Sequence, residues 1–380
     1  MSNGSPPLAV VAIRQCRRQT GAVRHAMEQA ACLREMGFRV TLLAECASPE
    51  TLTGIGWNWY RIPRWPIKGL QRRLFFDWMV QRRVQSLQPE IFISHGDARS
   101  DDLLFMHNCL HLESERIPGS SPSVPLEAQR FHHRVLTQNR FRYLVANSEL
   151  MKADLVRRFG LPAGKVRVFY QGVDTNEFRF ADRATLRALG RSRLAIEPRA
   201  LLIGLVTSGN FAKRNVGLFL RVAAIIYQTL PDARFLVAGK DSQVRKYQRQ
   251  ATDLGLASVV TFAPTIQEVA QYFHAVDLLL YPAWLEEYGH AVLEGLACGT
   301  PALVSTAVGA AEVMTAEGVP ELIEGWDETT WAQRALDVLR DPSRTEAMRS
   351  AGFQLARNYS SERRLDALRL LLEELGPSGR

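Results

Sequence analysis

The chain has 380 residues, of which 46% are hydrophobic and 23% charged, and its formal net charge is +8. This length favours two domains that each bury a core of their own, and the composition is typical of a soluble globular protein rather than a disordered or fibrous one. The five cysteines have no CxxC or CxxH spacing, so neither a disulfide framework nor a zinc site is predicted.

The first half of the chain carries the whole basic excess. Residues 1–180 hold 25 Lys and Arg against 16 Asp and Glu, a net charge of +9, whereas residues 181–380 hold 22 against 23, a net charge of −1. This asymmetry favours an anionic partner for the first half: nucleic acid, a membrane surface or an acidic glycolipid. The apolar run 8–13 is too short for a signal peptide or a membrane span, so the cytoplasm is the expected compartment.

Short β-branched runs alternate with amphipathic stretches, as in parallel sheets built from βα units. We expect strands at 8–13, 39–44, 91–94, 103–106, 143–147 and 166–170, and a second series at 201–206, 235–238, 259–262, 277–281 and 302–305. The predicted fold class is α/β, with two Rossmann-like doubly wound domains that face each other across a ligand-binding cleft. The expected parts are an N-terminal Rossmann-like domain 1–178, a connection 179–199, a C-terminal Rossmann-like domain 200–358, and a C-terminal helix 359–380 that packs back on the first domain.

The stretch 68–87 has a basic and partly apolar helical pattern. The apolar residues at approximately helical spacing are Leu70, Leu74, Phe75, Trp78 and Met79, and the charge comes from Arg72, Arg73, Arg82 and Arg83. Such a helix can lie in an anionic membrane interface with its apolar face down. The alternative is that the same residues pack on the domain's own sheet and leave the arginines solvated.

The segment 277–312 carries the most specific chemistry. A buried strand ends at Pro282, a loop holds Glu286, and Gly289 opens a helix. Gly289 allows the backbone to approach a ligand, and unpaired N–H groups at a helix N-terminus suit a diphosphate. In that helix Glu294 can accept both hydroxyl hydrogens of a ribose, and Glu286 can hold hydroxyls of an attached sugar. The alternative for a single glutamate near the start of a helix is that it binds no ligand and only interacts favourably with the helix dipole.

A diphosphate beside two carboxylates requires cations from elsewhere in the chain. The sequence TSGNFAKRN at 207–215 supplies Lys213 and Arg214 after a predicted strand. Arginine forks phosphate oxygens and lysine acts as a point charge, so together they could stabilise a departing nucleoside diphosphate without a metal ion. Taken alone, such a pair is more often simply solvated.

The second half resembles the retaining family 4 glycosyltransferases of GT-B architecture, whose Glu-x7-Glu signature appears here from Glu286 to Glu294. The similarity extends to Asp277, Pro282, the run LACGTPALVS and residues 309–312. In the first half, NSELMKADLVRRFG and KVRVFYQGVDTNEF resemble the end of that family's N-terminal domain. The general similarity is to members of the lipopolysaccharide-core type.

The resemblance implies a role for each matching residue. Glu294 would bind the nucleotide ribose, Glu286 the donor sugar, and Lys213 with Arg214 the phosphates. Further donor contacts are expected from Gly21, Phe262, Thr265, Tyr288, Gly289 and His290, and His107 would lie against the donor sugar; no metal or cofactor is expected. His107 also fits a strand-end histidine that hydrogen-bonds to backbone. Thr20 and Asn215 depart from the family pattern, which has glycine at both positions.

The expected reaction transfers a sugar, from a UDP-sugar in the first instance, to a hydroxyl of a cell-envelope glycan or lipopolysaccharide-core acceptor. No carboxylate nucleophile is evident, so front-side substitution is favoured over double displacement. Alternatives are a GDP-mannose-dependent mannosyltransferase, a nucleotide-sugar 2-epimerase of the same fold, and a nucleotide-sugar or nucleic-acid binding module. Nucleic acid is disfavoured because the arginines are not interleaved with exposed aromatics in a known reading motif. A position on the inner face of the cytoplasmic membrane would follow from a lipid-linked acceptor.

Overall fold

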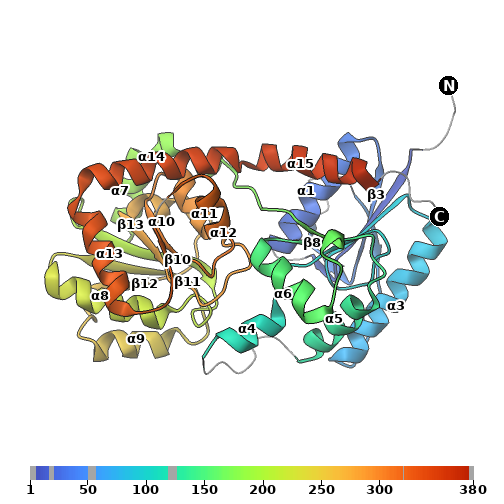
Figure 1. The fold of residues 1–380 in the computed structure, drawn as a ribbon, viewed down its shortest axis with the longest axis horizontal. Coiled ribbons are helices and arrows are strands. Elements are labelled where there is room, and N and C mark those ends of the chain that lie inside the picture. The colour runs from blue at the N-terminus through green and yellow to red at the C-terminus, as the bar shows by residue number, and fades with distance from the viewer. Residues whose placement is uncertain (1–5, 17–20, 50–56, 119–125, 320, 376–380) are drawn as a thin grey trace. The chain divides into compact units, whose positions relative to one another are not determined.

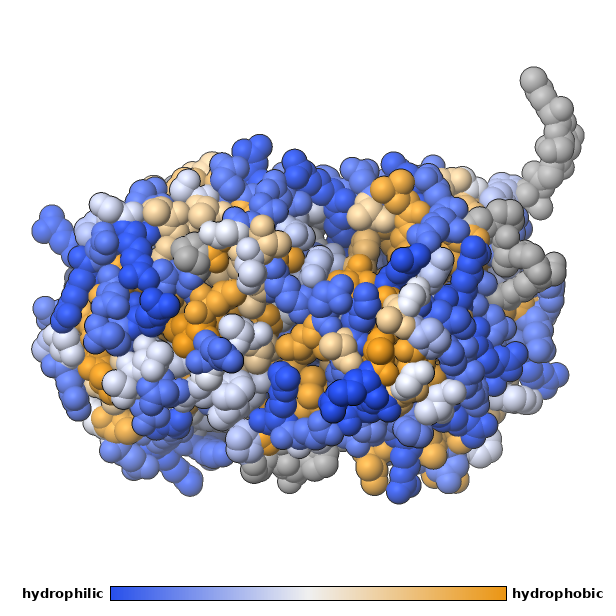
Figure 2. Space-filling view, viewed as in Figure 1, coloured by the Kyte–Doolittle hydropathy of each residue, from blue (hydrophilic) through white to orange (hydrophobic). Residues whose placement is uncertain are grey.

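The computed structural model describes residues 6–16, 21–49, 57–118, 126–319 and 321–375. The chain forms two compact units, each built around its own sheet (Figure 1). Unit 1 contains Met1–Ser114, Ser121–Phe169 and Glu362–Arg380, and unit 2 contains Glu115–Ser120 and Tyr170–Ser361. Hydrophilic side chains cover most of the face shown in Figure 2, with apolar side chains gathered in smaller patches between them.

Unit 1 has a seven-stranded parallel sheet in the order β5-β3-β1-β6-β7-β8-β9. Its strands are β1 (Leu8–Ala12), β3 (Arg39–Ala44), β5 (Asn58–Arg61), β6 (Ile91–Ser94), β7 (Leu103–Phe105), β8 (Tyr143–Ala146) and β9 (Val166–Val168), and β2 (Gln15–Cys16) pairs separately with β4 (Cys46–Ala47). The helices are α1 (Gly21–Glu35), α3 (Leu70–Leu87), α4 (Leu110–Arg116), α5 (Leu126–Gln138), α6 (Glu149–Phe159) and α15 (Ser361–Leu375).

Strand β1 shows how the sheet of unit 1 is buried on both faces. Ala9 and Val11 lie in one core cluster together with side chains of α1 and α15, whereas Val10 and Ala12 lie in a second cluster with α3. This alternation follows from the two-residue period of a strand. Helix α15, from the end of the chain, is tied to α1 by an Arg364–Glu28 ion pair of 3.0 Å and an Arg369–Glu35 pair of 2.9 Å (Figure 1).

Helix α3 covers the predicted amphipathic stretch, but it buries a different face from the one expected. Its fully buried apolar side chains are Phe76, Val80 and Val84, at a spacing of four residues. Trp78 is 48% exposed, and Leu70, Leu74, Phe75 and Met79 are half-buried. The alternative in which the predicted residues form the face that packs on the sheet is therefore wrong, because the spacing of apolar residues in this stretch fits two helical stripes and only packing selects one.

Unit 2 has a six-stranded parallel sheet in the order β12-β11-β10-β13-β14-β15. The strands are β10 (Leu202–Gly209), β11 (Arg234–Lys240), β12 (Val260–Ala263), β13 (Leu278–Tyr281), β14 (Ala302–Ser305) and β15 (Leu322–Ile323). The helices are α7 (Arg183–Arg193), α8 (Val216–Thr229), α9 (Val244–Asp253), α10 (Ala270–Ala275), α11 (His290–Ala297), α12 (Ala310–Ala316), α13 (Glu328–Arg340) and α14 (Pro342–Asn358). Leu279 and Tyr281 pack towards α10 and α11, and Leu278 and Leu280 pack towards α8 and α13.

All eleven strands expected from the sequence are present, and the prediction of two doubly wound α/β units is confirmed. The expectation missed the two-residue strands β2, β4 and β15 and also β5, whose four residues are all exposed at the edge of the sheet and carry no buried pattern. The chain changes unit between Phe169 and Tyr170, whereas the sequence placed that boundary at residue 178, and residues 362–380 lie in unit 1.

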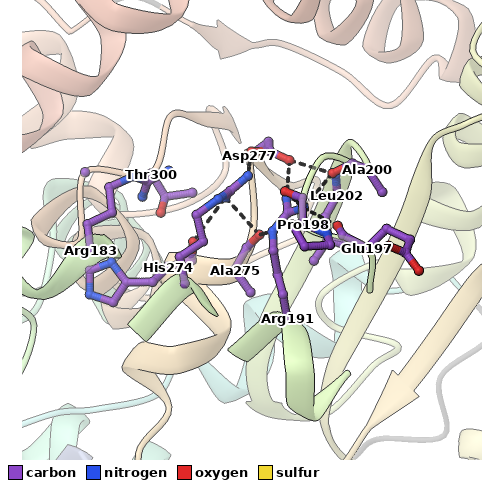
Figure 3. A network of polar contacts seen from close by, with 12 residues as sticks. Arg183, Arg191, Glu197, Pro198, Ala200, Leu202, His274, Ala275, Asp277 and Thr300 are labelled. Carbon is purple, nitrogen blue, oxygen red and sulfur yellow. Dashed lines mark hydrogen bonds and ion pairs between the residues drawn. The ribbon is translucent and has the colours of Figure 1, made fainter. Parts of the chain in front are cut away.

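Asp277 anchors α7, which lies in the expected interdomain connection, to the sheet of unit 2 (Figure 3). One carboxylate oxygen accepts from Arg187 at 2.6 Å, and the other accepts from Arg191 at 2.7 Å and from the Leu202 backbone N–H at 2.8 Å. Arg191 also donates to the carbonyl oxygens of Glu197, Pro198 and Ala200. One side chain thus joins α7 to the starts of β10 and β13, and the connection is part of unit 2.

We expect Asp277→Ala to lower the free energy of unfolding by about 2–4 kcal/mol, measured by urea denaturation. Removing one partner of a buried ion pair costs roughly 3–5 kcal/mol, and the 22% exposure of Asp277 reduces that loss. Asp182→Ala is the matched control, because the Arg179–Asp182 pair is well exposed, and its loss should stay below about 1 kcal/mol. Equal losses in both variants would contradict the anchoring role.

Candidate active site

The strand order of unit 2 reverses direction between β10 and β13. The chain runs outward from β10 through β11 to β12, then returns to place β13 on the other side of β10. In open α/β sheets such a switch point, at the carboxyl ends of the strands, is where ligands bind. The loops that follow β10 and β13 carry Lys213, Arg214 and Glu286, so the fold brings these predicted residues to one place.

The loop after β10 is held by two asparagines in left-handed conformations. Asn210 has φ 55° and its side chain accepts from the Lys213 N–H at 3.2 Å. Asn215 has φ 56° and caps α8 by accepting from the Leu218 N–H at 3.2 Å. Asparagine is one of the few non-glycine residues that adopts this conformation readily. Asn215 thus supplies both the backbone geometry expected of a glycine and a helix cap.

Two ion pairs join this loop to the one after β13. Lys213 Nζ lies 2.6 Å from Glu287 Oε2, and Arg214 lies 2.6 Å from Glu286 Oε2. All four side chains are largely buried, with exposures of 5% for Lys213, 4% for Glu287, 14% for Arg214 and 12% for Glu286. The site therefore contains two cations and two carboxylates in a small, dry volume.

Tyr281, the last residue of β13, connects the second of these pairs to the core. Its hydroxyl accepts from Arg214 Nε at 3.4 Å and donates to Glu286 at 3.4 Å. Burial, and then the charge of Glu286, raise the pKa of Tyr281 to about 12. Burial opposes the charge of Arg214, but the attraction of Glu286 and Tyr281 outweighs it and raises the pKa of Arg214 above its ordinary value. Both groups therefore keep their protons at every physiological pH.

Gly289 makes the close turn between the acidic loop and α11. Its φ is 100°, and a Cβ at this position would lie 2.7 Å from a methyl carbon of Val308. Only glycine fits without strain. No side chain caps α11 at Gly289, and the positive end of the helix dipole lies at this turn.

Of the predicted donor contacts near Gly289, Tyr288 is buried, whereas His290 and Glu294 are partly exposed. Tyr288 is 2% exposed and its hydroxyl donates to the Gln171 carbonyl at 2.6 Å, so this side chain fixes the loop from within. His290, the first residue of α11, and Glu294, one turn further, are both half-buried. Their roles as donor contacts remain predictions.

Phe262 and Thr265 lie at the end of β12 and in the loop that follows it. Strand β12 is separated from β10 by β11, so these residues sit two strands from the switch point. The Phe262 side chain is half-buried against the core, while Thr265 is exposed. Their predicted contact with the base would accordingly involve backbone groups.

His107 follows β7 in unit 1 and is one end of a chain of hydrogen bonds. His107 Nε2 lies 2.8 Å from His95 Nδ1, and His95 Nε2 lies 3.0 Å from Gln29 Oε1. Burial, followed by the charges of His107 and Arg364, holds the pKa of His95 well below its usual range. His95 is therefore a neutral side chain that orients His107. Gly21 is exposed at the start of α1, and the neighbouring Thr20 lies outside the described residues.

Glu287 is the site residue that sequence reasoning left without a role. Its ion pair with Lys213 is among the most buried in the described part of the chain. Charge balance could have identified Glu287, because one loop carries two adjacent cations and the other carries two adjacent carboxylates. Among the described residues, no group of three or more His, Cys, Asp or Glu side chains is arranged to hold a metal ion.

Two protein-family models match the chain. The model for glycosyl transferases group 1 matches residues 203–355, and the model for Glycosyltransferase Family 4 matches residues 19–177. The two matches together cover most of the strands of both units.

Curated relatives point to the same family. A D-inositol 3-phosphate glycosyltransferase from Mycobacterium sp. (strain KMS) is 32% identical over 251 residues, which are 64% of this chain and 54% of that protein. One from Streptomyces avermitilis is 31% identical over 225 residues, which are 56% of this chain and 47% of that protein. The chain spans about half the length of the curated relatives it matches.

Solved structures share the fold at low identity. WaaG, a glycosyltransferase involved in lipopolysaccharide biosynthesis, has a TM-score of 0.79 at 17% identity and covers 98% of this chain and 100% of its own. Anabaena Alr3699/HepE in complex with UDP has a TM-score of 0.75 at 17% identity, with 97% and 100% covered. The fold is thus the GT-B architecture of two Rossmann-like α/β domains. With its two halves matched by these family models, the chain belongs to the family 4 glycosyltransferases.

Proposed function

We propose that the protein is a retaining glycosyltransferase that moves a hexose from a nucleoside-diphosphate sugar, with UDP as the first choice, to a hydroxyl of a cell-envelope glycan. The observation that supports this most directly is the burial of Lys213 and Arg214 beside Glu286 at the switch point of unit 2. Cations fixed at such a position stabilise the charge that develops on a departing diphosphate.

The donor would lie along the carboxyl edge of the sheet in unit 2. Its diphosphate would bind Lys213 and Arg214, with the positive end of the α11 dipole directed at it. Glu294 would hold the ribose and Glu286 the transferred sugar. The base would meet backbone groups near Phe262 and Thr265.

Front-side substitution is the mechanism we favour. The bond between the anomeric carbon and the phosphate oxygen breaks, the acceptor oxygen bonds to the same face of that carbon, and the acceptor proton passes to the leaving phosphate. A double displacement needs a free carboxylate nucleophile at the sugar, whereas Glu286, the carboxylate proposed to hold the sugar, is bound by Arg214 and Tyr281. His107, oriented by His95, would contact the donor sugar.

Named neighbours support the choice of donor and acceptor. The HepE structures contain UDP or UDP-glucose, which favours UDP, and WaaG acts in lipopolysaccharide biosynthesis, which favours a lipopolysaccharide-core glycan as acceptor. The curated relatives are named for D-inositol 3-phosphate, so that compound belongs in the acceptor panel. GDP-mannose is the second donor to test, and sugar isomerisation without an acceptor would instead indicate a 2-epimerase.

The first test separates the two glutamates of the signature. Glu294→Ala should raise the donor KM about tenfold or more, because it removes ground-state binding, whereas Glu286→Ala should mainly lower kcat by misplacing the sugar. Steady-state transfer rates, with circular dichroism as a check on folding, distinguish the two patterns. Wild-type kinetics in both variants would rule out this site.

The second test concerns metal ions. Because Lys213 and Arg214 supply the positive charge, transfer activity should survive excess EDTA with little change. After EDTA treatment, adding excess Mg²⁺ or Mn²⁺ should raise the transfer rate by less than about twofold. A tenfold change in rate would correspond to about 1.4 kcal/mol in the activation free energy. A strict requirement for either ion would contradict the assignment.

We further propose that unit 1 docks on anionic membrane to reach a lipid-linked acceptor. In the described part of the chain, five of the eight exposed large apolar side chains lie between residues 59 and 78; they are Trp59, Tyr60, Trp65, Ile67 and Trp78. We call them the aromatic–arginine surface, because Arg82 stacks over Trp78 at 5.0 Å and Arg83 over Tyr60 at 4.2 Å. Phe75 links Trp65 and Trp78, with ring centroids 4.9 and 5.8 Å away.

The composition of this surface favours lipid over nucleic acid. Arginines and exposed aromatics are in fact interleaved here, which corrects the sequence-based reason for setting nucleic acid aside. However, Ile67 is the most exposed of the five at 60%, and an aliphatic side chain inserts into lipid but offers no ring for base stacking. No helix in the described residues is long and apolar enough to cross a membrane.

The third test is vesicle co-sedimentation. Binding to vesicles with anionic lipid should be strong at low salt and fall at high salt, since each basic residue near an anionic surface adds roughly 1 kcal/mol. Replacing Trp65, Ile67 and Trp78 by serine should weaken binding about tenfold, whereas the equally exposed Leu189→Ser and Leu370→Ser should not. Failure to bind anionic vesicles, or tighter binding to a single-stranded oligonucleotide, would overturn the proposal.

A further inference from the structure

The Lys213–Glu287 pair is not needed to hold its two loops in place. The Lys213 carbonyl accepts from the Trp284 N–H at 3.0 Å, and the Lys213 N–H donates to Asn210. On the other loop, backbone bonds on either side of Glu287 fix Glu286 to Ala307 at 3.1 Å and Tyr288 to Ala310 at 2.6 Å. Both side chains therefore stand on backbone that is anchored independently, and their ion pair can open without unfolding either loop.

The four buried side chains of the candidate site balance one another's charges. Lys213 and Arg214 contribute two positive charges, and Glu286 and Glu287 two negative ones. A diphosphate diester adds about two further negative charges beside these carboxylates. A phosphate oxygen that contacts either cation at hydrogen-bond distance therefore competes with the carboxylate already paired with it.

The two pairs differ in how easily they exchange partners. Arg214 presents five N–H groups, so it can keep Glu286 and Tyr281 while it contacts a phosphate. Lys213 is a point charge at the end of a flexible stem, and its 2.6 Å contact with Glu287 occupies the position where a phosphate oxygen would bind most strongly. Glu287 is therefore the carboxylate that would give up its cation to a phosphate oxygen.

We infer that Glu287 is the resident counterion of Lys213, and that the donor diphosphate displaces it. This inference rests on the proposed function, because it presupposes that Lys213 binds the diphosphate. Glu287 then acts through Lys213 as a positioning residue: it holds the lysine in place while the site is empty, and it competes with the nucleoside diphosphate product and promotes its release. A merely structural glutamate would stabilise the fold without opposing nucleotide binding.

The Glu287→Gln variant tests the idea, because it removes the charge and nearly preserves the shape. Without its counterion, Lys213 should bind UDP about tenfold more tightly than in the wild type, measured by calorimetry. The melting temperature without ligand should fall, UDP should raise it by more than in the wild type, and kcat should fall with stronger product inhibition by UDP. Inorganic pyrophosphate, which lacks a nucleoside, should show the same direction of change.

Two controls separate this role from a general loss of stability. Glu321→Gln breaks another ion pair with a buried carboxylate in unit 2, to Arg344, and should lower the melting temperature without changing the affinity for UDP. The double variant Lys213→Met, Glu287→Gln removes both charges and should lose the gain in UDP affinity. If Glu287→Gln does not fold, Glu287→Asp, with a longer and weaker contact, should bind UDP with intermediate affinity.

The outcomes are distinguishable. If the wild type binds UDP and Glu287→Gln binds it no more tightly, the counterion role is overturned and the proposed function stands. If the wild type binds none of UDP, GDP and ADP, the proposed function falls and the inference falls with it.

Discussion

Four charged side chains have to be buried together at the carboxyl edge of the second sheet, and this constraint organises the site. An isolated buried charge costs several kcal/mol, so Lys213 and Arg214 are stable in this position only because Glu287 and Glu286 lie 2.6 Å away. The same burial gives the cations their chemical value, since a charge in a dry site acts on a ligand far more strongly than one in water. The proposed function and the stability of the site would therefore depend on the same four groups.

The fold meets this constraint through backbone hydrogen bonds rather than through the ion pairs themselves. Strands β10 and β13 are neighbours on either side of the switch point, so the loops that follow them meet. The first loop is shaped by Asn210 and Asn215 in left-handed conformations, and the second by the close turn at Gly289. Because the backbone is fixed independently, the exchange of partners inferred for Glu287 would leave both loops in place.

The parts that were predictable from the sequence are those with a strong local signal. Runs such as Leu278–Tyr281 are buried on both faces and read as parallel strands, and the spacing from Glu286 to Glu294 identified the acidic loop and its helix. Glu287 was not predictable, because no periodicity in a loop shows which of two adjacent carboxylates meets a lysine 74 residues away. The buried face of α3 was misjudged for a related reason: Phe76, Val80 and Val84 form as regular a stripe as the residues first chosen.

The two units handle charge in opposite ways. In unit 2 the buried cations Lys213 and Arg214 are matched by carboxylates within the candidate site, which fits a net charge near zero over residues 181–380. In unit 1 the segment 57–84 holds seven Lys and Arg and a single acidic residue, Asp77, which is buried and paired with Arg99. Arg72 and Arg73 are paired with carboxylates outside this segment, Glu45 and Asp97. The charge that accompanies the exposed rings of the aromatic–arginine surface therefore comes from Arg82 and Arg83, which stack over Trp78 and Tyr60. Internal compensation would suit the exchangeable diphosphate proposed for unit 2, whereas guanidinium groups on exposed rings would suit the anionic surface proposed for unit 1.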